Sequence, residues 1–243
     1  MPRQQSEAII LRTFHIGEQD KVVVFFSRDM GILKGIAKGA RKFGNRFGSS
    51  LEPMSWVNIF YYEKERRELV TISHCDIIES FFEIQKDLRT NFTLSYFAEL
   101  IEEFYPQRAQ DDILFRLLVS ILRALEEGGD IGSLTAYFEA WLLKMTGFLP
   151  DLSRCHKCHN DITELGWLSP KKDGALCPQC ASTQKEKIGP EVTEFLRWIK
   201  KNPPSKPLPS SLSGDKVARL RKILEQMIVF HLEREPKTLA YIR

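Results

Sequence analysis

Four of the five cysteines are arranged as two C-x-x-C pairs, a spacing that suits metal binding. The pairs are Cys155 with Cys158 and Cys177 with Cys180, and 18 residues separate them. Each pair places two thiolates on one tight turn, and the two turns together supply the closed tetrahedral shell of a structural zinc ion. We therefore predict one structural zinc ion on these four cysteines. A redox dithiol, which needs only one pair, and four unrelated thiols are the alternatives.

The other cysteine and the nearby histidines suggest no further chemistry. His156 and His159 flank the first pair, but four thiolates fill a zinc site without imidazole, so we expect both histidines to lie in solvent. Cys75 follows His74 in a predicted strand, where adjacent side chains point to opposite faces. A buried thiol is therefore expected at Cys75 rather than a Cys/His nucleophile.

Residues 31–48 form a strongly basic stretch, with no acidic residue between Met30 and Leu51. Five glycines in this stretch allow positive φ and close approach of the backbone to a ligand, while Phe43 and Phe47 offer flat apolar faces. Cations beside aromatic rings are typical of single-stranded nucleic-acid binding, and a solvated loop that only keeps the protein soluble is the alternative. The candidate DNA contacts are Lys34, Lys38, Arg41, Lys42 and Arg46.

Sequence motifs of catalytic sites do not fit this chain. A zinc deaminase needs His-x-Glu before its cysteines, whereas the only such tripeptide, His231 to Glu233, follows them. The phosphate-binding loop, H-E-x-x-H and G-x-S-x-G motifs do not occur. Adjacent carboxylates such as Asp111 and Asp112 diverge by about 100° on a helix. We predict that the protein is not an enzyme and has no small-molecule substrate.

The charges are nearly balanced over the 243 residues, with a net charge of +3, but they are unevenly distributed. Lys and Arg number 12 against 10 Asp and Glu in residues 1–80, 6 against 11 in 81–150, and 17 against 11 in 151–243. Basic ends favour nucleic-acid partners, which an acidic middle repels. No apolar run approaches the roughly 18 residues of a membrane helix, and the N-terminus lacks a signal-peptide core. We expect a cytoplasmic protein without a membrane partner.

The first 80 residues predict five short strands of one small barrel, because they contain short runs rich in Val, Ile, Phe and Tyr. Successive strands are expected to be antiparallel neighbours. In an OB-type barrel, a strand face and the adjoining loops form the usual oligonucleotide surface, and the basic stretch covers the third strand and the connection after it. The expected strands are residues 8–13, 22–27, 32–37, 55–62 and 69–77, with a charged loop at 63–68.

From residue 81 the apolar residues recur at the helical period. Helices are also expected at 190–201, where a proline opens the first turn, and at 215–234. We predict an α+β fold made of an OB-type barrel and an α-helical domain with an inserted zinc module. The expected domains are the barrel at 1–80, the helical domain at 81–150, the four-cysteine zinc-binding module at 151–187, and C-terminal helices at 188–243, joined by a Pro-rich linker and packing on the helical domain.

Two motifs resemble the bacterial RecO family of DNA repair and recombination mediators. The first is the pattern LRT, GE, DK, GIL and AKGAR between Leu11 and Arg41, and the second is GFLP at Gly147 to Pro150 followed by the cysteine quartet. The resemblance spans nearly the whole chain. It implies an N-terminal OB domain, a central helical domain and a zinc-binding region.

The resemblance also implies a function in recombinational DNA repair. It implies binding of single- and double-stranded DNA, annealing of complementary strands coated with single-strand-binding protein, and assistance with RecR in loading RecA. The tail of single-strand-binding protein would enter an apolar groove of the helical middle, and the protein would lie in the bacterial cytoplasm at the nucleoid. Arg12 and Lys21 match the family's basic pattern as weaker candidates for DNA contact. A zinc-stabilised adaptor that binds only proteins is the alternative function.

Overall fold

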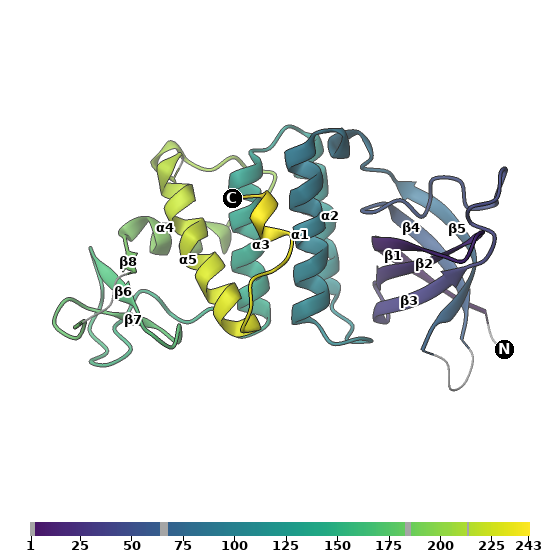
Figure 1. The fold of residues 1–243 in the computed structure, drawn as a ribbon. Coiled ribbons are helices and arrows are strands. Elements are labelled where there is room, and N and C mark those ends of the chain that lie inside the picture. Colours follow the sequence, from purple (N-terminus) through teal and green to yellow (C-terminus); the bar gives the residue numbers. More distant parts are fainter. Residues whose placement is uncertain (1–2, 64–67, 183–185, 213) are drawn as a thin grey trace. The chain divides into compact units, whose positions relative to one another are not determined.

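Five strands of the computed structural model close into a barrel at the N-terminal end of the chain (Figure 1). The structure describes residues 3–63, 68–182, 186–212 and 214–243. The predicted α+β fold and all five predicted strands are confirmed, while most of the charged loop predicted at 63–68 lies outside the described residues. The strands are β1 (Arg3–Ile16), β2 (Asp20–Ser27), β3 (Gly31–Ala37), β4 (Trp56–Tyr62) and β5 (Val70–Glu79).

The strand order around the barrel is β1-β2-β3-β5-β4, and β4 pairs with β1 to close it. The prediction that successive strands are all antiparallel neighbours was wrong at one place, because β3 pairs with β5, in parallel, rather than with β4. A tight turn forces two strands together, whereas the long connection of residues 38–55 lets β4 pair elsewhere. Gly35 permits the β3–β5 pairing, since a Cβ there would lie 2.8 Å from Cγ1 of Ile72.

Helices and short 3-10 turns make up most of the rest of the chain. The helices predicted at 190–201 and 215–234 are confirmed with slightly different ends. Asp87 and Asp130 cap the first and third helices by accepting a backbone N–H at their N-termini. No helix in the described ranges is long and apolar enough to cross a membrane. The elements are η1 (Glu83–Lys86), α1 (Leu88–Phe104), α2 (Asp112–Glu126), α3 (Ile131–Met145), α4 (Pro190–Ile199), η2 (Ser210–Leu212), α5 (Asp215–Leu232) and η3 (Leu239–Tyr241).

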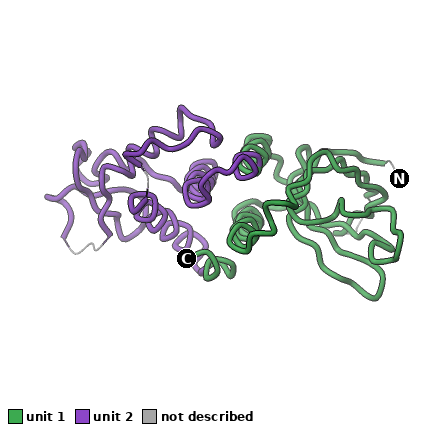
Figure 2. The backbone as a smooth tube through the Cα atoms, turned by 90° about the horizontal axis from the view of Figure 1, so that it is seen from above, with its two compact units in different colours: residues 1–122, 236–243 green, residues 123–235 purple. Residues whose placement is uncertain are grey.

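The chain divides into two compact units (Figure 2). Unit 1 contains residues 1–122 and 236–243, and unit 2 contains residues 123–235. The last segment of unit 1 is attached to α1 through Glu99, whose carboxylate accepts the backbone N–H groups of Lys237 and Thr238 at 2.8 and 2.9 Å. Unit 1 is therefore built from two pieces of chain that are far apart in sequence.

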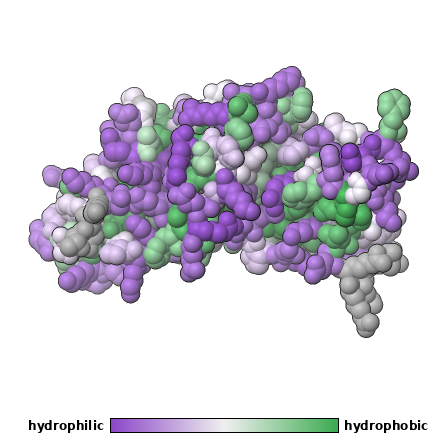
Figure 3. Space-filling model, viewed as in Figure 1, coloured by the Kyte–Doolittle hydropathy of each residue, from purple (hydrophilic) through white to green (hydrophobic). Residues whose placement is uncertain are grey.

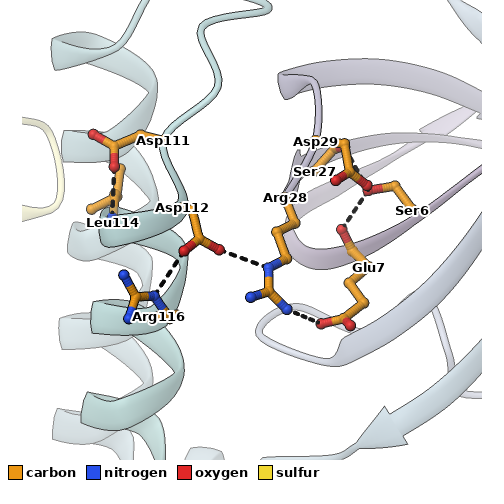
Figure 4. Close-up of polar contacts among 9 residues, drawn as sticks. All are labelled: Ser6, Glu7, Ser27, Arg28, Asp29, Asp111, Asp112, Leu114 and Arg116. Atoms are coloured by element: carbon orange, nitrogen blue, oxygen red, sulfur yellow. Dashed lines mark hydrogen bonds and ion pairs between the residues drawn. The ribbon is translucent and has the colours of Figure 1, made fainter.

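Within unit 1, the start of α2 is fixed to the hairpin between β2 and β3 (Figure 4). Nε of Arg28 donates to Oδ1 of Asp112 at 2.7 Å, and Nη1 of Arg28 donates to Oε2 of Glu7 at 3.2 Å. The hydrogen bond from Arg28 holds the pKa of Asp112 below its usual value. Beside this network the ring of Phe115 lies 6.1 Å from that of Phe26 on β2, so one part of the barrel's outer face is covered by a helix.

Gly31 is the position in the barrel where we expect a small substitution to be costly. Its φ is +66°, and an added Cβ would lie 2.2 Å from the carbonyl oxygen of Ala109. Gly31→Ala should lower the free energy of unfolding by more than about 2 kcal/mol, because the backbone must shift. Gly17→Ala is the control, since Gly17 has a φ of +57° with nothing within 4 Å, and it should lose only about 1–2 kcal/mol. Urea unfolding would compare them, and equal losses would contradict the close approach.

Candidate nucleic-acid interface and metal centre

The four predicted cysteine ligands come together in unit 2. Their Sγ atoms all lie within 4.8 Å of one another, and the Sγ atoms of Cys158 and Cys177 are 3.6 Å apart. A tetrahedral ion with metal–sulfur bonds of about 2.3 Å requires sulfur–sulfur distances of about 3.8 Å. The quartet therefore has the size and the donor set for a tetrahedral metal ion.

Backbone hydrogen bonds give the two C-x-x-C pairs their turns. The N–H of His159 donates to the carbonyl oxygen of Cys155 at 2.8 Å, and the N–H of Cys180 donates to that of Cys177 at 3.0 Å. The surrounding residues form a small sheet in the order β7-β6-β8. These strands are β6 (Gly166–Leu168), β7 (Ala175–Leu176) and β8 (Lys187–Ile188).

The backbone around Cys155 favours the thiolate form of this cysteine. Burial raises the pKa of its thiol, but the backbone N–H groups of Cys158, Cys177 and Lys157 donate to the sulfur and outweigh burial, so that the pKa falls to about 6.

The prediction that the histidines flanking the first pair lie in solvent is confirmed, since both His156 and His159 are exposed. The interpretation of Cys75 is confirmed as well. Its thiol is 4% exposed inside the barrel, and burial raises its pKa to about 11, whereas the neighbouring side chain of His74 is 43% exposed and pairs with Asp76. Cys75 is therefore an inert core thiol.

The connection after β3 begins with the basic loop, residues 38–46, which hydrogen bonds fix to the barrel. The backbone N–H of Gly39 donates to Oδ1 of Asp20 at 2.7 Å, and the N–H of Arg41 donates to the carbonyl of Gln19 at 2.9 Å. Nε of Arg46 donates to the carbonyl of Ser73 on β5 at 2.8 Å. The loop is thus held by both the β1–β2 turn and β5.

Three of the predicted cations surround one hollow at the basic loop. Lys38, Lys42 and Arg46 line a hollow of about 420 Å³, in which Asp20 is the acidic residue. The guanidinium of Arg41 instead donates to two carbonyl oxygens of the β1–β2 turn. Among the described residues, these four cations and Lys34 have no carboxylate within 4.0 Å.

The weaker candidates are both engaged in ion pairs of unit 1. Nε of Arg12 lies 2.6 Å from Oε1 of Glu102 on α1, and Nζ of Lys21 lies 3.4 Å from Oε1 of Glu52. Lys34 is on the outer face of β3, in the cross-strand row that Arg12 and Val24 begin. Lys34 is therefore part of the barrel surface, whereas the side chain of Arg12 is bound to α1.

The two aromatic residues of the basic stretch have opposite environments. Phe43, at the tip of the basic loop, is 108% exposed, whereas Phe47 is 3% exposed within the barrel core. The interpretation of Phe47 as a free apolar face was wrong, because its ring fills the barrel while the guanidinium of Arg46 lies 4.7 Å from it. Only Phe43 of this pair is presented to solvent.

Sequence reasoning missed the exposed apolar row next to Lys34. Phe14, Val22 and Ile36 are cross-strand neighbours on β1, β2 and β3, and none of them belongs to the barrel core. Phe14 is 46% exposed, and Figure 3 shows hydrophobic side chains gathered over these strands. We call Phe14, Val22, Lys34 and Ile36 the strand face. The alternation along each strand could have indicated this row once the inward set was known.

Two family descriptions match almost the whole chain. The description "Recombination protein O N terminal" matches residues 1–81, and "Recombination protein O C terminal" matches residues 85–240. The boundary between the two matches falls just after β5, where the barrel ends.

Curated relatives match over similar lengths. The DNA repair protein RecO of Koribacter versatilis is 34% identical over 243 residues, covering 98% of each chain. The proteins of the same name from Pelotomaculum thermopropionicum and from a strain of Dehalococcoides mccartyi are both 30% identical, and they cover 100% and 98% of this chain and 94% of their own. The chain therefore belongs to the RecO family of DNA repair proteins.

Proposed function

We propose that this protein binds single- and double-stranded DNA through the basic loop and the strand face, as a mediator of recombinational DNA repair. The observation that supports this most is the hollow lined by Lys38, Lys42 and Arg46, whose cations have no ion-pair partner among the described residues. Cations without carboxylate partners are available to phosphates, and an OB-type barrel offers this surface to oligonucleotides. The relatives are named as DNA repair proteins, which agrees with such a function.

The mechanism we propose is electrostatic and involves no bond chemistry. Lysine and arginine side chains neutralise phosphates and release counterions, which lowers the repulsion between two complementary strands. Contacts of this kind carry no sequence information, so the preference for particular sequences is weak. Two strands held in this way would be free to anneal.

The metal we propose for the cysteine quartet is one structural zinc ion. Four thiolates suit a closed tetrahedral shell, and the polar residues 151–182 have only a small apolar core of their own. The ion would hold the two C-x-x-C turns together in place of a larger core. Its proposed role is structural.

The family membership supports further proposals about partners. We propose that the protein works with RecR to assist RecA loading, and that the C-terminal tail of single-strand-binding protein docks on the helical part of the chain. Such a protein acts in the bacterial cytoplasm at the nucleoid. A strand-annealing assay with and without single-strand-binding protein tests the docking, and annealing that is the same with tailless single-strand-binding protein would contradict it.

Removing two lysines of the hollow should weaken DNA binding and its salt dependence. With Lys38→Ala and Lys42→Ala together, we expect the plot of log affinity for single-stranded DNA against log salt to flatten by about 1.4, because each phosphate contact contributes about −0.7. Fluorescence anisotropy with a labelled oligonucleotide at several salt concentrations measures both quantities.

The matched control is Lys86→Ala, which removes a surface lysine that pairs with Glu83 in η1 at 2.7 Å. Its salt slope should equal that of the unmodified protein. Binding that ignored salt, or a double variant with an unchanged slope, would instead favour the adaptor that binds only proteins.

A further inference from the structure

The tip of the basic loop presents an aromatic ring that the fold does not use. Phe43 is 108% exposed, more than any other large hydrophobic residue recorded as exposed in the described ranges. Leaving such a ring in water gains nothing for folding, because apolar surface stabilises a fold only when it is buried. The exposed ring is therefore free to contact a ligand.

Hydrogen bonds of Asn45 fix the backbone of the loop before and after Phe43. The side-chain amide of Asn45 donates to the carbonyl of Lys42 at 3.1 Å, and Oδ1 of Asn45 accepts the backbone N–H groups of Phe47 and Gly48 at 3.0 and 3.1 Å. Gly44 adopts a φ of +65° directly after Phe43. The chain therefore turns sharply at the ring, and a ligand would meet a preorganised loop at a low entropic cost.

The charges around the ring identify the class of ligand. Phe43 lines the same hollow as Lys38, Lys42 and Arg46, so a ligand that reaches its ring also lies close to three cations. A ligand that combines a flat apolar face with regularly spaced negative charge is a nucleic acid with unpaired bases. A duplex hides the faces of its bases within the stack and presents mainly phosphates.

We propose that Phe43 stacks on an unpaired base of a strand whose phosphates are held by Lys38, Lys42 and Arg46, and that this contact makes the surface prefer single strands to duplexes. This inference rests on the proposed DNA binding of the basic loop. It assigns different roles to the residues of the loop: the cations bind the phosphates of any DNA, and the ring of Phe43 binds only unpaired bases. Phe47 takes no part, since its ring is in the barrel core.

The test compares two strands that differ only in their bases. One is an oligothymidylate of about 16 nucleotides, the upper site size of one OB fold, and the other has the same phosphates with abasic sites. Phe43→Ala should weaken binding to oligothymidylate about 10-fold, while leaving the abasic strand, a duplex and the salt slope unchanged. Phe43→Leu should behave like Phe43→Ala, because it keeps apolar bulk without an aromatic face, and Phe43→Trp should retain the affinity.

The outcomes separate this inference from the proposed function. If the unmodified protein binds no DNA, the proposed function fails. If it binds with the expected salt slope but Phe43→Ala leaves oligothymidylate binding unchanged, only the stacking role fails. An equal loss on the oligothymidylate and the abasic strand would also overturn stacking, because it would show that the ring shapes the loop rather than contacts a base.

Discussion

Cys177→Ser is expected to abolish metal binding and to unfold the region around the quartet. Cys177 is 4% exposed and belongs to the small core that Cys155 and Leu176 form, so its loss opens the closed shell at a buried ligand. Structural zinc contributes about 10–16 kcal/mol of apparent binding free energy in zinc-finger peptides, and folding of such regions depends on it. Metal analysis should fall from about one ion per chain to none, and limited proteolysis should cut within residues 151–182.

Cys75→Ser is the control for the loss of a buried thiol outside the quartet. Cys75 is as buried as Cys177, but it lies in the barrel core. This variant should keep its full metal content and its resistance to cleavage within residues 151–182. If Cys177→Ser folds normally and retains its metal, or if the unmodified chain contains none and is folded, the proposed zinc site is wrong.

Arg221→Ala is expected to cause a large loss of stability in unit 2. Nη2 of Arg221 on α5 lies 3.5 Å from Oε1 of Glu139 on α3, and the side chain of Glu139 is completely buried. Removing the arginine leaves a buried carboxylate without this cation, which costs about 3–5 kcal/mol in comparable buried pairs. Urea unfolding monitored by the helical circular dichroism signal measures the loss.

A neighbouring arginine on the same helix supplies the control. Arg219 pairs with Glu191 at 3.2 Å, but its side chain is 58% exposed, so Arg219→Ala should cost less than about 1 kcal/mol. Replacing both buried partners by Glu139→Leu and Arg221→Met should restore most of the stability, because no charge is then left in the core. Similar losses for Arg219→Ala and Arg221→Ala would show that burial does not strengthen the pair.

Local patterns predicted the secondary-structure elements of the barrel and the four cysteines that come together in unit 2. The C-x-x-C spacing and the runs of strand-forming residues are each recognised within a few neighbouring residues. The barrel strands and the cysteine quartet are found where these patterns place them. The parallel pairing of β3 with β5 depends on how a long connection crosses the barrel, and no local pattern contains that information.

The burial and the partners of individual side chains were harder to predict than the secondary structure. Phe43 and Phe47 lie in the same short basic stretch, yet one is at the loop tip and the other is in the core. The difference arises from the turn that Asn45 stabilises, which sends the chain back to the barrel between them. The pairing of Arg12 with Glu102, 90 residues apart, was equally beyond the reach of sequence spacing.

The attachment of residues 236–243 to Glu99 has a consequence for how the protein is made. On the ribosome, the barrel and α1 emerge first, but the backbone N–H groups that Glu99 accepts are synthesised only after all of unit 2. Until then the ring of Phe92 on α1 also lacks Tyr241, whose ring stacks on it at 4.8 Å. Unit 2 is therefore an insertion in the sequence of unit 1, and premature termination before residue 236 would leave unit 1 without the segment that Glu99 and Phe92 contact.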